Sequence, residues 1–218
     1  MPEIYFIPGL GANHLLFQKQ AEAGISFKVL EYIPAMKGES LDSYVRRFAQ
    51  RINDKENCIL LGVSFGAMIA TEIANIMPVQ KVINISGIKT MDEIPFYFKI
   101  LKFFKLQFLL PSSWIMQLAL LARPIFGAMH DAERKIFTDI IKTTDPEFVK
   151  WAVDKIVSWT NKTIPSNYLH IHGSKDLIFP VFTIQKPYKK IKGGGHFMIV
   201  THAFEINKMI KKVVSEPN

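Results

Sequence analysis

Short apolar runs alternate along the chain with stretches in which apolar residues recur every three or four positions. The short runs are β-prone and predict strands at residues 4–7, 27–31, 58–63, 82–86, 168–172 and 188–192. The helical spacing predicts helices at residues 13–23, 41–53, 66–77 and 203–214. Strands that alternate with helices indicate an α/β fold, in which helices cover both faces of a mostly parallel sheet.

A long helical insertion separates the fourth and fifth predicted strands. About eighty residues lie between positions 86 and 168, whereas a crossover between neighbouring strands needs far fewer. We expect an inserted helical cap over residues 89–159 and a core made of residues 1–88 and 160–218. Asp145 and Pro146 are typical of a helix start, so the last helix of the insertion is expected to begin there and to return the chain to the sheet.

Ser64 stands between Gly62 and Gly66, where a predicted strand meets a predicted helix. In a sharp strand-to-helix turn, the residues two before and two after the serine approach each other closely, so both must lack a side chain. The helix N-terminus then directs its free N–H groups at the reacting centre. The context predicts a nucleophile elbow at Ser64.

A serine hydroxyl is a poor nucleophile and needs a base and an orienting acid. The stretch from Tyr168 to Pro180 is a predicted strand followed by a glycine turn that contains Asp176. A later predicted strand leads into three glycines and His196. Serine, aspartate and histidine therefore follow one another in an order that a single sheet can bring together.

On these motifs the chain resembles the α/β-hydrolase superfamily, as a small serine esterase-like member. The resemblance implies that Ser64, Asp176 and His196 form a catalytic triad. It also implies a reduced α/β-hydrolase sheet of about six strands, because only the strand predicted at residues 4–7 precedes the first glycine turn. In the family that turn, here Pro8 to Gly11, supplies an oxyanion donor, so the backbone N–H groups of Leu10 and Phe65 are the expected oxyanion hole.

The resemblance places the inserted cap above the nucleophile. The aromatic stretch from Phe96 to Trp114 is therefore expected to roof an apolar pocket, with Phe96, Phe104 and Trp114 as candidate pocket residues. His14 follows the glycine turn closely and is a further candidate for the pocket. His170 and His172 fall in a central strand and are expected to be buried and hydrogen-bonded rather than catalytic.

The expected activity is hydrolysis of an ester with a small or medium apolar acyl group through an acyl-enzyme, as in a carboxylesterase. The expected partner is thus a small-molecule acyl substrate, with no cofactor; scattered histidines and one cysteine, Cys58, offer no metal ligand cluster. The alternatives are a thioesterase, a carbon–carbon bond hydrolase or a lyase on the same scaffold. A non-catalytic binding protein is an alternative of another class.

Composition and charge add little to this interpretation. The 218 residues, 49% of them hydrophobic, suffice for one catalytic domain. The formal net charge of +8 comes from scattered lysines without a nucleic-acid-binding motif, so we expect no nucleic-acid partner. Lys99, Lys102 and Lys105 recur among aromatics as in a basic amphipathic helix, but the predicted cap explains this stretch without a membrane surface. With no signal peptide or membrane-length apolar run in the sequence, a cytoplasmic location is expected.

Overall fold

A parallel sheet of six strands forms the centre of the computed structural model, which describes residues 2–53, 57–104 and 111–215. The strand order is β2-β1-β3-β4-β5-β6, and every neighbouring pair is parallel. The strands are β1 (Glu3–Ile7), β2 (Lys28–Val29), β3 (Cys58–Val63), β4 (Lys81–Ile85), β5 (Tyr168–Gly173) and β6 (Lys189–Ile191). The predicted fold class is confirmed.

Alternate residues of each strand enter different apolar layers, because successive side chains of a strand point to opposite faces. Tyr5 and Leu60 belong to one buried cluster, whereas Phe6 and Leu61 belong to the other. The innermost strand β3 is buried along its whole length. The edge strands β2 and β6 are shorter than predicted, since each pairs with one neighbour only.

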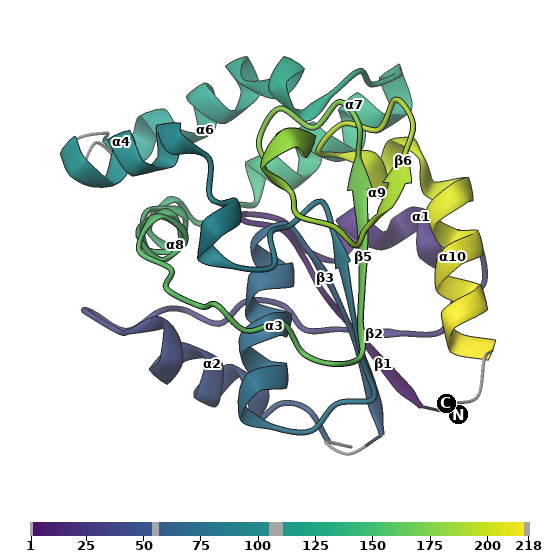
Figure 1. Ribbon diagram of the computed structural model, residues 1–218. Coiled ribbons are helices and arrows are strands. Elements are labelled where there is room, and N and C mark those ends of the chain that lie inside the picture. Colours follow the sequence, from purple (N-terminus) through teal and green to yellow (C-terminus); the bar gives the residue numbers. More distant parts are fainter. Residues whose placement is uncertain (1, 54–56, 105–110, 216–218) are drawn as a thin grey trace.

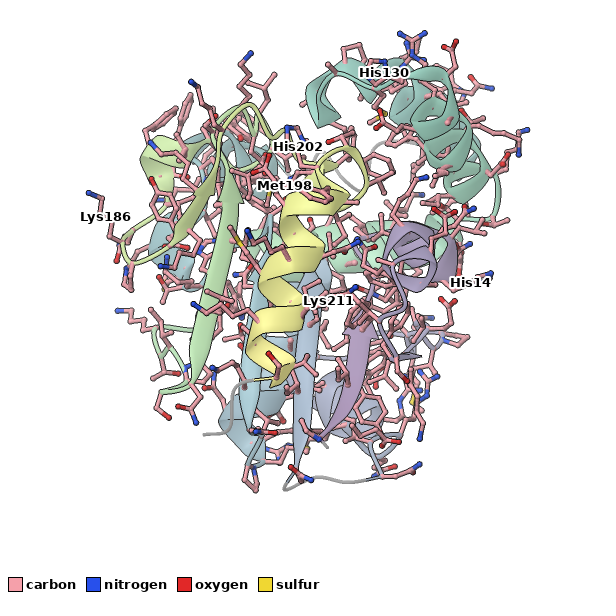
Figure 2. All side chains as sticks on the ribbon, turned by 90° about the vertical axis from the view of Figure 1, so that its right-hand side faces the viewer. His14, His130, Lys186, Met198, His202 and Lys211 are labelled. Carbon is pink, nitrogen blue, oxygen red and sulfur yellow. The ribbon has the colours of Figure 1, made fainter. Side chains whose placement is uncertain are left out.

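Helices cover both faces of the sheet (Figure 1). The layer that contains Tyr5 packs against α2 (Leu41–Ala49) and α3 (Phe65–Ile76). The opposite layer packs against η1 (His14–Phe17), α9 (Met198–Thr201) and α10 (Ala203–Ser215), and α10 runs down this face in Figure 2. The helix predicted at residues 13–23 is divided into η1 and α1 (Gln18–Glu22). The helix predicted at 41–53 ends at Ala49.

Five helical elements lie between β4 and β5 in the described residues, after the short turn η2 (Met91–Glu93). They are α4 (Phe96–Phe104), α6 (Ser112–Leu121), η3 (Arg123–Phe126), α7 (Asp131–Lys142) and α8 (Pro146–Val157). The Asp145 carboxylate accepts a hydrogen bond from the Glu147 N–H, so α8 begins where the sequence predicted. Part of the predicted aromatic roof, residues 105–110 with Lys105, lies outside the described residues.

The inserted helices contact both apolar layers. Phe148 and Ile156 of α8 join the layer with α2 and α3, whereas Phe137 and Ile140 of α7 join the layer with α9 and α10. The insertion therefore bridges the two layers. Because all strands are parallel, the loops after β1, β3, β5 and β6 meet at one edge of the sheet.

Candidate active site

Ser64 occupies the turn between β3 and α3 with a left-handed backbone, φ 54° and ψ −117°. Such a conformation strains a non-glycine residue and occurs mainly where the surrounding structure enforces it. At Ser64, two glycines allow the surrounding backbone to enforce this conformation. A Cβ on Gly62 would lie within 3.0 Å of the backbone of Gly66, and a Cβ on Gly66 would lie within 3.0 Å of the Ile7 and Pro8 carbonyl oxygens. The predicted need for glycine at both positions therefore has a steric basis.

His196 follows β6 and the three glycines at 193–195. Its Nε2 lies 2.9 Å from the Ser64 Oγ. The two glycine turns pack tightly here, since a Cβ on Gly173 would lie within 3.0 Å of the Gly194 carbonyl group. The rings of Phe126 and Phe179 each lie with their centroids 5.7 Å from that of His196, so the imidazole is held between apolar groups.

Asp176 lies in the turn after β5, and its Oδ2 is 2.8 Å from the Nδ1 of His196. A carboxylate only accepts hydrogen bonds, so Nδ1 carries the imidazole proton and Nε2 presents its lone pair to the Ser64 hydroxyl. The other carboxylate oxygen, Oδ1, accepts from the N–H groups of Ile178 at 2.8 Å and Phe179 at 2.9 Å. Burial raises the pKa of Asp176, but His196, His172 and the Phe179 N–H outweigh it and leave the pKa below its ordinary value.

The loop after β1 lies directly against the serine. A Cβ on Gly9 would be 3.6 Å from the Cβ of Ser64, an ordinary contact distance. Tyr32 donates its hydroxyl to the Pro8 carbonyl at 2.6 Å, and Thr144 donates to the Gly11 carbonyl at 2.5 Å. These two hydrogen bonds fix the loop on both sides of Leu10. Phe65 is the first residue of α3, so its N–H has no acceptor within the helix.

A cavity of about 210 Å³ opens beside Ser64 and His196. Its walls come from the first loop, the strand edge and the inserted helices, and no Asp, Glu, Lys or Arg is among the described residues that line it. The residues that contribute the largest apolar side chains are Leu10, Leu16, Phe98, Phe126, Phe137, Ile140, Ile141, Ile156, Ile178, Phe179 and Phe197. The cavity suits an apolar group.

The four predicted pocket residues do not line this cavity. His14 has a side chain that is 68% exposed and paired with Glu31, and Figure 2 places it on the outer surface. Phe96, Phe104 and Trp114 are also exposed, at 71%, 60% and 56%. In the sequence of α4 the apolar positions span most of the helix circumference and only Lys99 and Lys102 interrupt them, so the pattern did not reveal which apolar side chains face inward.

The inward residue of α4 is Phe98, which stacks on Phe179 with centroids 5.7 Å apart. Phe137 and Ile140 of α7 were also missed as pocket residues. Helical spacing marks them as one apolar stripe with Ile141, which is the sequence signal that pointed to them. The sequence does not reveal that this stripe lines the cavity beside the serine as well as packing into a core layer.

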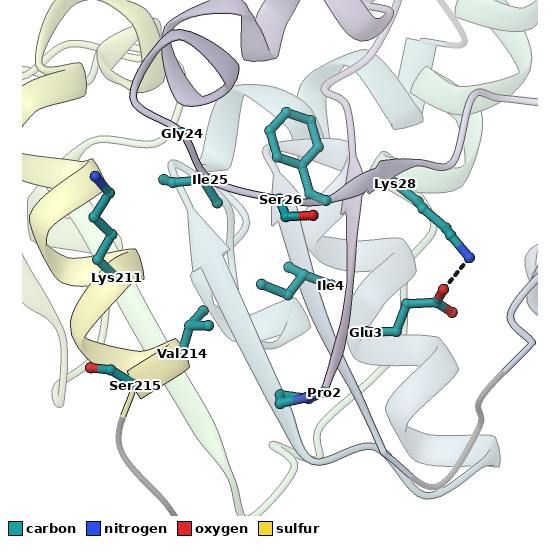
Figure 3. A pocket seen from close by; sticks show the side chains of 11 residues that line it. Pro2, Glu3, Ile4, Gly24, Ile25, Ser26, Lys28, Lys211, Val214 and Ser215 are labelled. Carbon is teal, nitrogen blue, oxygen red and sulfur yellow. Dashed lines mark hydrogen bonds and ion pairs between the residues drawn. The ribbon is translucent and has the colours of Figure 1, made fainter.

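A larger cavity, of about 470 Å³, lies at the opposite end of the sheet (Figure 3). It is bounded by the start of β1, the segment before β2 and the end of α10. Its wall includes the ion pair of Lys28 with Glu3. Ser64 and His196 do not line it, whereas both line the smaller cavity.

Within residues 2–53, 57–104 and 111–215, no group of three or more His, Cys, Asp or Glu side chains is arranged to hold a metal ion. None of the helices in the described parts of the chain combines the length and the apolar character of a membrane-spanning segment.

No protein-family model and no curated protein matches the sequence. Solved structures do match the fold. A thermophilic esterase from Thermogutta terrifontis has a TM-score of 0.72 at 15% identity, with 98% of this chain and 89% of that chain covered. A bromoperoxidase from Bacillus anthracis gives 0.71 at 15% identity, covering 99% and 93%. A meta-cleavage product hydrolase from Pseudomonas fluorescens gives 0.66 at 14% identity, covering 100% and 92%. This chain has the α/β-hydrolase fold.

Proposed function

We propose that the protein is a serine hydrolase that cleaves esters of small or medium apolar acyl groups through an acyl-enzyme. The observation that carries this proposal is the continuous hydrogen-bonded chain from Ser64 through His196 to Asp176, at 2.9 and 2.8 Å, beside an apolar cavity. Similarity to esterases in fold is consistent with it but supports no particular substrate.

In the proposed reaction, His196 Nε2 takes the proton of the Ser64 hydroxyl as Oγ attacks the acyl carbonyl. The Asp176 carboxylate stabilises the imidazolium that forms. The Leu10 and Phe65 N–H groups donate to the oxyanion, and each such donor contributes roughly 3 kcal/mol to barrier lowering. His196 then protonates the departing alcohol. Water, activated by the same imidazole, hydrolyses the acyl-enzyme and restores Ser64.

The cavity limits the acyl group that this mechanism would use. Its volume of about 210 Å³ suits a small or medium acyl group. The aromatic walls favour an alkyl or aryl group and penalise a charged one, because a buried charge without a partner is costly. The inserted helices, from Phe98 to Ile156, supply much of this wall and so act as a cap over the site.

Intact-mass labelling with a fluorophosphonate tests the proposal. We expect a single adduct on the native protein, none on Ser64→Ala, and an unchanged adduct on Ser43→Ala, a control on the exposed surface of α2. Hydrolysis of p-nitrophenyl acetate, butyrate and octanoate should likewise depend on Ser64. An adduct that persists in Ser64→Ala, or hydrolysis that does, would overturn the assignment. Rates measured in parallel on thioesters and on substrates with a cleavable carbon–carbon bond would distinguish an esterase from a thioesterase or a carbon–carbon bond hydrolase.

A further inference from the structure

A second group of buried ionisable side chains lies behind Asp176. Lys89 follows β4, Glu93 is in η2, and His170 and His172 are in β5. All four are at most 2% exposed. The reaction proposed above does not use them, yet burying charged groups is costly unless hydrogen bonds compensate for lost hydration. Their arrangement therefore requires an explanation.

The hydrogen bonds of this group have one consistent direction. His172 Nε2 lies 2.8 Å from the Phe179 carbonyl oxygen, which only accepts, so Nε2 carries a proton. In a neutral ring, His172 Nδ1 is then an acceptor, and His170 Nε2 at 3.2 Å must donate to it. His170 Nδ1 in turn accepts from the Lys89 ammonium group, also at 3.2 Å.

Lys89 is satisfied by this arrangement. Its three N–H groups face His170 Nδ1, the Glu93 carboxylate at 2.8 Å and the Gln185 carbonyl oxygen. The Glu93 carboxylate also accepts from the N–H groups of Lys89 at 2.6 Å and Gln185 at 2.8 Å. The ion pair is thus fully hydrogen-bonded within the protein, which is the condition under which a buried pair is tolerated.

Protonation of either histidine would break the series of hydrogen bonds that joins Lys89, His170 and His172. If His172 gained a proton at Nδ1, that N–H would face His170 Nε2, and His170 would have to present an N–H to the Lys89 ammonium group. Two donors would then face each other in a buried site. In agreement, burial, His172 and Lys89 lower the pKa of His170 well below 6.5, and burial lowers the pKa of His172.

The last ring of this hydrogen-bonded series, His172, lies beside Asp176. His172 Nε2 is 3.8 Å from Asp176 Oδ2, the same oxygen that accepts from His196. A charged His172 would compete with His196 for that oxygen. His172 also holds the carbonyl group of Phe179, whose N–H donates to Asp176 Oδ1.

We propose that Lys89, held in place by Glu93, is a positioning residue for the acid: it keeps His170 neutral and, through the hydrogen bond between the two rings, His172 as well, so that the charge of Asp176 acts on His196 alone. The other groups that face the two histidines are the Asp176 carboxylate and the His196 imidazole beside His172, the Tyr188 ring, with centroids 6.1 and 6.4 Å away, and the Gly87 carbonyl group beside His170. None of these groups is a permanent cation that would replace Lys89, and the Asp176 carboxylate favours the charged form of His172. The role of this pair in catalysis rests on the hydrolase function proposed above.

The test uses Lys89→Met with Glu93→Gln, which removes both charges together and avoids an unpaired buried carboxylate. The first readout is the imidazole ¹⁵N shift of His170 and His172 between pH 5 and 8. We expect both rings of the native protein to remain neutral Nε2–H tautomers throughout, and at least one to titrate in the double variant. The exposed pair on α2 serves as the control in Arg46→Met with Asp42→Asn, and should change neither ring.

The second readout is the pH profile of kcat/KM on the best p-nitrophenyl ester. In the double variant the acid limb should move to higher pH and steepen, with about a tenfold loss at pH 6 relative to the native enzyme. Activity at pH 8.5 should stay near that of the native enzyme. A loss that is equal at every pH, or native rings that titrate near pH 6.5, would overturn the proposal.

Lys89→Arg, made in the native protein, should keep the native pH profile of kcat/KM, because arginine retains the positive charge. An absence of any esterase activity would refute the hydrolase assignment alone, because the ¹⁵N shifts report the state of the histidines without turnover.

Discussion

Gly62 and Gly66 approach so closely that a Cβ on Gly62 would lie within 3.0 Å of the Gly66 backbone. The strained turn that exposes Ser64 therefore depends on two missing side chains.

Gly62→Ala is expected to cost about 3 kcal/mol of unfolding free energy, because the added methyl group meets backbone that cannot move aside. Gly38→Ala is the matched control, since Gly38 has a φ of 72° but nothing within 4 Å of its would-be Cβ. It should cost only the left-handed strain, about 1 kcal/mol. Urea unfolding of both variants measures the difference. Equal losses of unfolding free energy in the two variants would show that the close approach of Gly62 to Gly66 does not exclude a side chain.

Asp176→Asn is expected to lower kcat by about 10³- to 10⁴-fold without unfolding the protein. The Ile178 and Phe179 N–H groups would hold the amide oxygen where Oδ1 now lies. The amide NH₂ would then face His196 Nδ1 and force the imidazole proton onto Nε2, which could no longer accept from Ser64. Steady-state kinetics on a p-nitrophenyl ester check this, with the far-UV circular dichroism spectrum as the folding control. A fall of less than tenfold would contradict the assigned tautomer.

Val153→Phe should narrow the cavity, because Val153 lines it from α8. We expect kcat/KM for the octanoate ester to fall at least about tenfold relative to acetate, since overpacking an apolar site costs 1 to 3 kcal/mol. Ile164→Phe makes a similar enlargement at an exposed position and should leave the ratio unchanged. If Val153→Phe lowers the rates of acetate and octanoate equally, the acyl group does not enter this cavity.

The free energy of unfolding should decrease as the pH falls below about 6.5. Both His170 and His172 have lowered pKa values in the folded protein, so in this range the unfolded chain binds protons that the folded chain does not. Two such groups give a slope of up to about 2.7 kcal/mol per pH unit. Urea titrations at pH 5.0 to 7.5 measure it. Asp176, whose pKa is also lowered, contributes to the loss only at more acidic pH. A flat profile over this range would contradict the neutral state of the two histidines.

The sequence predicted the sheet because its central strands are buried on both faces, which leaves short apolar runs between helices of clear periodicity. It also predicted Ser64, Asp176 and His196 as one site, and the structure brings these three within hydrogen-bonding distance. Their positions follow from chain order and glycine turns, which are local signals.

The pocket was not predictable in the same way. Phe98 and Phe96 lie two residues apart on α4, yet one stacks on Phe179 and the other is exposed. Which face of an apolar helix turns inward depends on tertiary packing, which no local pattern records. The direction of the hydrogen bonds between Lys89 and the two histidines is likewise set by contacts between residues about eighty to ninety-six positions apart in the sequence.

The wall of the apolar cavity is drawn from the whole length of the chain, from Gly9 near one end to Phe197 near the other, with the inserted helices between them. Only a fragment that reaches from Gly9 to Phe197 contains all of it. The proposed binding site for the acyl group therefore forms only when segments from both ends of this range have docked. Turnover of a medium-chain ester would then report completion of folding, whereas spectroscopic signals report individual helices and strands.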